Sequence, residues 1–159
     1  MRRKATLITG AAGEVGQALV ERIVEQNNTH VISMDIKPLP AELDSKVQHI
    51  VGDILDHSLF DRLVSKYDIT HIYHLAALLS TSAEYSPMLA HNVNVGGTMR
   101  LLQLAAEQSE WKRDPVIFIF PSSVAAFGMD SLENKAAHPR PEEWEWNKPI
   151  TMYGCNKLY

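Results

Sequence analysis

Short apolar runs alternate with amphipathic stretches along most of this chain of 159 residues. Five runs, at 5–9, 31–35, 47–51, 71–77 and 116–120, have the length and composition of buried strands. Most of the stretches between them repeat apolar residues at the spacing of one helix face. Strands that alternate with helices form a parallel sheet with helices on both of its faces. The pattern therefore predicts a doubly wound α/β fold, in which ligands bind at the carboxyl ends of the strands.

Three glycines follow the first strand at intervals of three residues, at Gly10, Gly13 and Gly16. Gly10 would let the chain turn sharply, and Gly13 would let the backbone approach a pyrophosphate. Gly16 would let the next helix lie close to the sheet. The free N–H groups and the positive end of that helix would then be directed at the anion. The spacing indicates a phosphate-binding loop. A flexible turn has the same composition, so the residues around the loop have to decide between the two.

An acidic residue is expected about 20 residues beyond such a loop, where it binds the ribose of a dinucleotide. Asp35 stands there, at the end of the second predicted strand. A carboxylate accepts hydrogen bonds from the ribose hydroxyls and repels a 2′-phosphate, so the predicted cofactor is NAD rather than NADP. Asp53 and Ile54 end the third strand and are candidates to bind and pack the adenine. The alternative is that they only terminate a strand.

The helical segments carry their own signals. Asp56 is a good N-cap for a helix that reaches Tyr67, and Asn27–Asn28 is expected to end the first helix. Pro87 begins a long helix, which Asn94 and two glycines interrupt at a cost in stability that hints at close packing or function. The proline-rich and acidic stretch 129–149 predicts an ordered surface loop.

Composition narrows the function classes. The net charge of −4 and a pI near 5.9 provide no basic surface for nucleic acid. A single cysteine, Cys155, excludes an internal disulfide framework and a cysteine zinc site, and suits a cytoplasmic location. No apolar run approaches the ~20 residues of a membrane span, and the first strand begins too early for a signal peptide. His71 and His74 would point to opposite faces of one strand, so no metal site is predicted.

Tyr153 and Lys157 stand four residues apart in the helix predicted over 150–159, and therefore on one face. A nearby cation favours an ionised phenol and lowers its pKa from the usual value of about 10. Such a tyrosine can take the proton of an alcohol while hydride leaves the same carbon for nicotinamide. Ser123, after the fifth strand, could hold the alcohol oxygen and steady the developing alkoxide. The same spacing occurs by chance in many helices, so it gains meaning only beside the dinucleotide site.

With these residues the sequence resembles the extended short-chain dehydrogenase/reductase family, which includes nucleotide-sugar epimerases, dehydratases and short-chain L-threonine dehydrogenases. TGAAGEVG at 9–16 looks like the family's TGxxGxxG, and HLAA at 74–77 resembles its HxAA segment over the cofactor. NVGGT at 94–98 resembles its NVxGT, and PSSVAAFG at 121–128 resembles the segment that carries the catalytic serine. The resemblance covers the whole chain and implies a Rossmann-like sheet with strand order 3-2-1-4-5.

The resemblance also implies roles for particular residues. Ser123, Tyr153, Lys157 and Asn94 would be catalytic, and the role of Asn94 would be to support a proton-relay water. Lys157 would in addition bind the nicotinamide ribose, and no metal is implied. The residues expected to bind NAD are Gly10, Gly13, Glu14, Val15, Gly16, Asp35, Asp53, Ile54, Leu75, Ala76, Ala77, Asn94, Tyr153 and Lys157.

The substrate is less sharply indicated. AALLSTSAE at 76–84, in which Ser80 would lie near the substrate, looks more like threonine dehydrogenases than sugar epimerases. The segment 138–146 departs from that subgroup, which usually carries Thr-Pro-Gln before the tyrosine. The favoured reaction is oxidation of a secondary alcohol in an L-threonine-like small hydroxy acid. A nucleotide-sugar epimerase or dehydratase is the alternative.

A third alternative is an NAD-binding fragment without activity. The chain reads as one NAD-binding domain over 1–159 that ends just after the Tyr153–Lys157 motif. Members of the family continue beyond this motif into a substrate-binding lobe, so that lobe is expected to be absent here. We expect a small-molecule substrate and a homo-oligomer, because the apolar fifth strand would lie at an open edge of the sheet.

Overall fold

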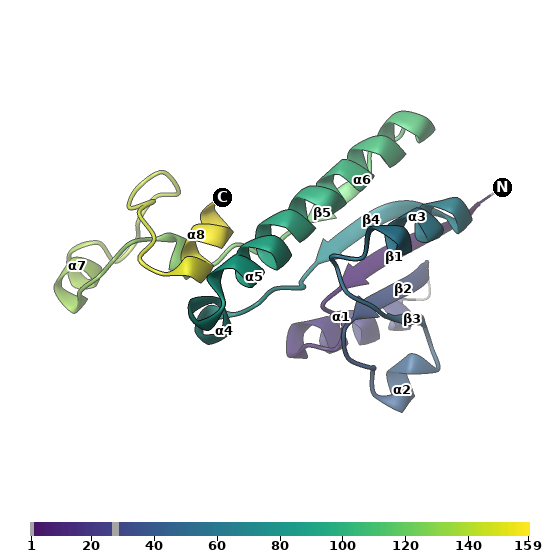
Figure 1. Ribbon diagram of the computed structural model, residues 1–159, viewed down its shortest axis with the longest axis horizontal. Helices are drawn as coiled ribbons and strands as arrows, with labels where there is room; N and C mark the ends of the chain where they lie inside the picture. The colour runs from purple at the N-terminus through teal and green to yellow at the C-terminus, as the bar shows by residue number, and fades with distance from the viewer. Residues whose placement is uncertain (1, 27–28) are drawn as a thin grey trace. The chain divides into compact units, whose positions relative to one another are not determined.

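The computed structural model describes residues 2–26 and 29–159 (Figure 1). The predicted end of the first helix at Asn27–Asn28 lies outside the described residues. The chain forms two compact units. The first, called the sheet unit below, comprises Met1–Ala76 and Gly97–Pro121, and the second, called the helical unit, comprises Ala77–Gly96 and Ser122–Tyr159. The single domain predicted over the whole chain stays a prediction.

The sheet unit contains one parallel sheet with strand order β3-β2-β1-β4-β5, which confirms the predicted fold and order. At the centre, Ile8 of β1 lies opposite Ser33 of β2 and Tyr73 of β4. These central strands are buried on both faces, at the last five positions of β1 and the middle four of β2, and the buried positions hold mostly apolar residues together with Thr6, Thr9 and Ser33. The strands are β1 (Arg3–Thr9), β2 (His30–Asp35), β3 (Gln48–Val51), β4 (Tyr67–His74) and β5 (Ile117–Ile119).

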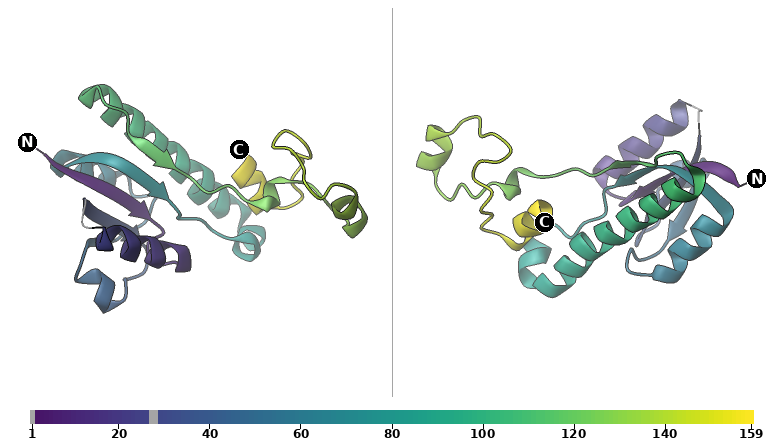
Figure 2. Two further views of the ribbon diagram at one scale, coloured as in Figure 1. Left: turned by 180° about the vertical axis from the view of Figure 1, so that it is seen from behind. Right: turned by 90° about the horizontal axis from the view of Figure 1, so that it is seen from above.

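Helices cover both faces of this sheet. They are α1 (Glu14–Glu25), α2 (Ala41–Asp44), α3 (His57–Lys66) and α6 (Gly97–Lys112). Figure 2 shows α1 on one face of the sheet and α3 with α6 on the other. On the α1 face, Ile8 and Val31 pack with Val20 of the helix. On the other face, Arg100 of α6 pairs with Asp61 of α3 at 3.0 Å.

Most strand and helix predictions hold, with shifted ends. The prediction of β4 over 71–77 is wrong at both ends, because Tyr67 already pairs with Arg3 while the chain leaves the sheet after His74. The strand β5 is shorter than the apolar run at 116–120. The capping prediction is confirmed, since the Asp56 carboxylate accepts a hydrogen bond from the Ser58 N–H at 3.0 Å.

The helical unit is built from short helices and turns. The interruption predicted around Asn94 is confirmed and takes the form of a π-helical turn between two α-helices. The surface loop predicted over 129–149 also contains a helix, because the Ser131 side chain caps a new first turn. The elements are α4 (Ser80–Tyr85), α5 (Pro87–His91), the π-helical turn Asn92–Gly96, a 3-10 turn at Val124–Ala126, α7 (Leu132–Ala137) and α8 (Met152–Leu158).

Within residues 2–26 and 29–159, no helix combines the length and the apolar content that a membrane crossing requires.

Candidate cofactor and catalytic site

The glycine loop connects β1 to α1, and two of its glycines are required by the chain itself. Gly10 has a φ of 71°, and a Cβ there would lie 2.5 Å from the Ala76 nitrogen. A Cβ on Gly16 would lie 2.2 Å from the Gly10 carbonyl oxygen. A larger residue at Gly10 would push the turn away from the end of β4. A larger residue at Gly16 would push α1 away from the turn. These two positions agree with the roles predicted for them.

Gly13 is less tightly enclosed, because among the described residues an added Cβ would meet only the Gly10 carbonyl oxygen, at 3.3 Å. It is the N-cap residue of α1 and offers no side-chain acceptor to the first helical turn. The next two residues, Glu14 and Val15, are exposed. The start of α1 has no side-chain cap, and N–H groups left free at a helix start suit a bound phosphate. This is the observation by which the loop fits a dinucleotide.

Asp35 ends β2 and reaches the glycine loop. One carboxylate oxygen accepts from the Ala12 N–H at 3.0 Å, and the other accepts from the Lys37 N–H at 3.0 Å. A carboxylate has about four acceptor positions, so both oxygens keep capacity for ribose hydroxyls. Asp35 therefore holds the loop in place and also fits the ribose role predicted for it.

Asp53 and Ile54 lie in different surroundings, although they are neighbours. Asp53 is exposed, and its carboxylate accepts from the Leu55 N–H at 2.9 Å. Ile54 is only 6% exposed, because its side chain fills the space beside Gly97 at the start of α6. Asp53 is thus the member of the pair that is accessible to an adenine.

The end of β4 is held against the end of β1. His74 is buried, with Nδ1 at 2.7 Å from the Thr9 hydroxyl and Nε2 at 2.9 Å from the Thr98 hydroxyl. The Leu75 N–H donates to the Thr9 carbonyl oxygen at 3.0 Å. His74 is therefore a structural histidine that joins β1, β4 and α6. In the described part of the chain no group of His, Cys, Asp or Glu could hold a metal ion.

The helical unit carries all four residues predicted to be catalytic, which are Asn94, Ser123, Tyr153 and Lys157. Tyr153 and Lys157 lie on α8, with the Lys157 Nζ 5.8 Å from the centre of the Tyr153 ring. Burial lowers the pKa of the Lys157 ammonium below its ordinary value. Thr151 begins the helix, and its hydroxyl accepts from the Gly154 N–H at 3.0 Å.

Ser123 stands at the start of the 3-10 turn, where its hydroxyl accepts from the Ala125 N–H at 3.2 Å. This turn packs directly on α8, since a Cβ on Gly154 would lie 2.1 Å from the Ala125 carbonyl oxygen. The glycine beside Tyr153 thus permits contact between the turn that bears Ser123 and the helix that bears Tyr153. The contact with Ala125 therefore requires glycine at position 154, which sequence reasoning did not identify.

Asn94 lies in the π-helical turn and is 3% exposed. Its amide oxygen accepts from the Leu78 N–H at 2.7 Å, and its amide nitrogen donates to the Leu78 carbonyl oxygen at 3.0 Å and to Asn156 Oδ1 at 3.2 Å. Sequence reasoning missed Asn156. The sequence gives no signal for it, because a polar residue in a short helix is equally typical of a face exposed to solvent. Of the remaining predicted residues, Ala77 is half-buried and Ser80 is exposed at the start of α4.

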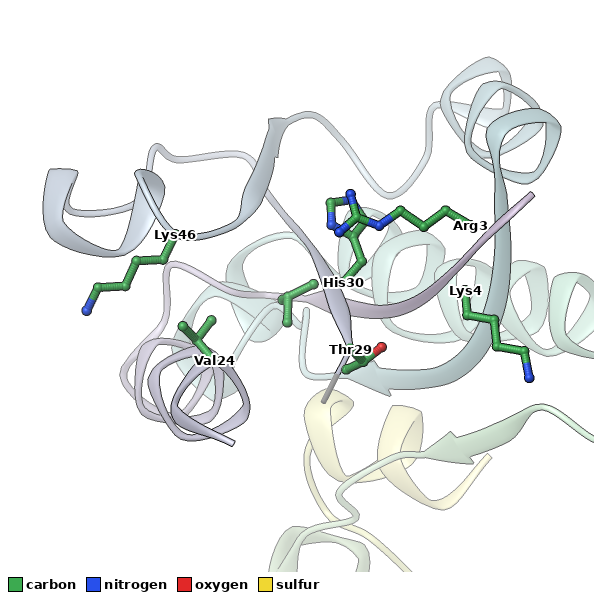
Figure 3. A pocket seen from close by; sticks show the side chains of 7 residues that line it. Arg3, Lys4, Val24, Thr29, His30 and Lys46 are labelled. Carbon is green, nitrogen blue, oxygen red and sulfur yellow. The ribbon is translucent and has the colours of Figure 1, made fainter. Parts of the chain in front are cut away.

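A hollow of about 540 Å³ opens elsewhere in the sheet unit. It lies at the amino ends of β1 and β2, whereas the glycine loop follows the carboxyl end of β1. Figure 3 shows the ammonium groups of Lys4 and Lys46 pointing to opposite sides, so they do not converge on one ligand. The hollow is separate from the predicted cofactor site. Its lining residues are Arg3, Lys4, Val24, Thr29, His30, Val31 and Lys46.

The family model described as "NAD dependent epimerase/dehydratase family" matches residues 6–159. The chain belongs to this family. Its members are NAD-dependent enzymes, and the resemblance inferred from the motifs is confirmed. An uncharacterized epimerase/dehydratase of Staphylococcus aureus is 36% identical, over 98% of this chain and 46% of its own length.

Solved structures of two kinds are similar to the chain. L-threonine dehydrogenase from Clostridium difficile matches with a TM-score of 0.79 and 31% identity, over 99% of this chain and 47% of that one. UDP-glucose 4-epimerase from Brucella ovis, solved in complex with NAD, matches with a TM-score of 0.74 and 25% identity, over 98% of this chain and 45% of that one. The chain spans about half the length of the relatives it matches.

Proposed function

We propose that this chain is the NAD-binding part of a dehydrogenase that oxidises a secondary alcohol of a small, L-threonine-like hydroxy acid. The observation that carries the proposal is the packing of the Ser123 turn on the helix that bears Tyr153 and Lys157. The stretch AALLSTSAE at 76–84 and the similarity to a threonine dehydrogenase at 31% identity support this substrate class.

NAD would be held chiefly by the sheet unit. The glycine loop and the uncapped start of α1 would take the pyrophosphate, and Asp35 would accept from the ribose hydroxyls. Asp53 would accept from the adenine amino group. Lys157 would contribute a cation and a donor to the nicotinamide ribose.

The chemistry of this chain's own residues is proton transfer. Ser123 would hold the substrate alcohol oxygen by a hydrogen bond, and Tyr153 would accept the alcohol proton at its phenolic oxygen. Lys157 would place its positive charge beside this base, since its Nζ lies 5.8 Å from the centre of the Tyr153 ring. When bound, NAD supplies the acceptor for the hydride that leaves the same carbon, and the product is a ketone.

A nucleotide-sugar epimerase is the second candidate, and two observations favour it. The segment 138–146 lacks the Thr-Pro-Gln of the threonine-specific subgroup, and UDP-glucose 4-epimerase has a similar fold over nearly the whole chain. An epimerase would use the same tyrosine and cofactor but return the hydride to the sugar.

One experiment separates the two candidates. The complete gene product is incubated with NAD and L-threonine, and in parallel with NAD and UDP-glucose. Formation of NADH with L-threonine supports the dehydrogenase, whereas appearance of the 4-epimer without net NADH supports the epimerase. If titration calorimetry detects no binding of NAD, both candidates are wrong.

We also propose that the 159-residue chain by itself has little activity, since it covers about half of its relatives. The gene sequence beyond the codon of Tyr159 and a turnover assay on the isolated chain test this. An isolated chain that oxidises substrate at an ordinary enzymatic rate would contradict it.

A further inference from the structure

Two buried amides face each other in the helical unit. Asn94 is 3% exposed and Asn156 is 5% exposed, and the Asn94 amide nitrogen donates to Asn156 Oδ1 at 3.2 Å. The rest of the Asn94 amide pairs with Leu78, whose N–H and carbonyl oxygen it bonds at 2.7 and 3.0 Å. Both N–H groups of the Asn94 amide are therefore used inside the protein.

A buried amide is costly unless its polar atoms are bonded, so this arrangement is not a neutral filling of space. The bonds of Asn94 connect three separate segments: the stretch after β4 that contains Leu78, the π-helical turn, and α8. Single π-helical turns inside longer helices occur often at functional sites. Here the turn brings one amide into contact with the helix that carries the predicted base.

The helix α8 needs such support. It has seven residues, which is too short to be stable without packing. Its amino end is held by Thr151 and by the Glu84 carboxylate, which accepts from the Met152 N–H at 2.6 Å. Asn156 lies in the other half of the helix, three residues after Tyr153 and directly before Lys157. A bond at this point resists rotation of α8 about its axis.

We propose that Asn156 is a positioning residue, which acts through its bond to Asn94 to fix the directions of the Tyr153 and Lys157 side chains. This inference rests on the roles proposed above for those two residues. It also assigns the amide N–H groups of Asn94 to holding α8 and Leu78.

The test compares three variants. Asn156→Leu keeps the approximate size and removes the acceptor, whereas Asn156→Asp keeps the size and the acceptor oxygen. Cys155→Ala is the matched control, because Cys155 is the exposed neighbour on the same helix. Hydrogen exchange of the backbone N–H groups is measured on the 159-residue chain, and turnover and NAD affinity are measured on the complete gene product.

In Asn156→Leu we expect faster exchange in α8 with unchanged exchange in β1 and α1, and a loss of about ten- to a hundredfold in kcat. NAD affinity should fall much less than kcat, because among the residues proposed to hold NAD only those on α8 would be displaced, and those proposed to hold its pyrophosphate, adenine and adenosine ribose lie in the other unit. Asn156→Asp should recover much of kcat, although burial of a carboxylate limits the recovery.

Equal exchange and equal kcat in Asn156→Leu and the control would overturn the proposal, as would a loss in the Leu variant that the Asp variant does not reduce. If the unaltered protein neither binds NAD nor turns over substrate, the proposed function fails instead. The exchange data then still decide whether Asn156 holds α8.

Discussion

The two units of the protein are stabilised in different ways. The sheet unit buries large apolar side chains completely, among them Leu7, Ile8 and Phe60. The buried apolar side chains of the helical unit are smaller: Ala83, Ala90, Val95 and Ala126. Its short helices are held by hydrogen bonds between side chains and backbone and by close approach at glycine. The stabilisation from apolar burial is proportional to the buried area, so a small local change costs only part of it. A specific hydrogen bond is lost when a single donor or acceptor atom is removed.

This difference suits the two predicted tasks. A cofactor scaffold needs a stable sheet from which a loop and a carboxylate project. Proton transfer needs atoms placed to within fractions of an ångström, which packed glycines and buried amides provide. The helical unit should therefore lose function after substitutions that barely change its stability, and the sheet unit should lose stability first.

The largest effect is expected from Tyr153→Phe in the complete gene product. Turnover should fall by about 10²- to 10⁴-fold, the usual contribution of a general base, because the ring packs as before and only the hydroxyl is lost. NAD affinity and the free energy of unfolding should stay nearly unchanged. Tyr85→Phe, at a tyrosine of the same unit that is 86% exposed, is the control. Wild-type turnover in Tyr153→Phe would contradict the proposal that the helical unit carries the catalytic base.

Next in size is the effect of Phe60→Ala on the sheet unit. Phe60 is 0% exposed, so its truncation should lower the free energy of unfolding by about 3–5 kcal/mol. Trp144→Ala in the helical unit should change it by no more than about 0.5 kcal/mol, because Trp144 is 76% exposed. Urea unfolding of both variants measures the difference. Similar losses would show that the two units do not differ in the way described.

A smaller effect is expected at the cofactor. Asp35→Ala should weaken NAD binding by about tenfold, the value of a hydrogen bond to a charged group, and should narrow the gap between NAD and NADP. Asp44→Ala, at an exposed carboxylate of the same unit, should leave both affinities unchanged. Calorimetric titration with each cofactor gives the values. Equal or tighter binding of NADP by the unaltered chain would contradict the ribose role of Asp35.

Self-association should also depend on the sheet unit. The strand β5 lies at one edge of the sheet, with Ile117 51% exposed, and an apolar edge offers unpaired backbone groups to another chain. We expect light scattering to detect a dimer or larger species, and Ile117→Lys to shift it toward monomer. Leu132→Lys, on α7 of the helical unit, should not have this effect. A monomer at all concentrations tested would refute the expectation.

The smallest effect concerns pH. Burial lowers the pKa of Lys157 below the value of 10.5 that the unfolded chain would show. The unfolded chain then binds more protons between the two values, so stability should rise with pH through that window, and the cost of the buried charge is fully present below it. The change should be small, since the group is only about half buried and is screened by solvent.

Lys157→Met should remove this rise, and Lys135→Met, at an exposed lysine of the same unit, should keep it. Urea unfolding at a series of pH values up to about 10.5 measures the slope. A slope that is identical in Lys157→Met and the unaltered chain would contradict the burial of the Lys157 charge.

Local sequence alone determined the alternation of strands and helices, the glycine turn, the Asp56 cap and the interruption at Asn94, because each depends on residues within a few positions of one another. The family motifs predicted the strand order and the family correctly. The ends of β4 could not be read in this way, since pairing with β1 decides where that strand begins.

Only the tertiary structure decided how α8 is held. Asn94 meets Asn156 across 62 positions of sequence, and Glu84 meets Met152 across 68. Neither pair can be recognised from the sequence, because an amide or a carboxylate is also common on a solvent-exposed helix face. Likewise Gly154 becomes necessary only once the Ala125 carbonyl lies against it. Local chemistry is thus readable from neighbours along the chain, whereas the placement of the predicted catalytic helix depends on contacts that exist only after folding.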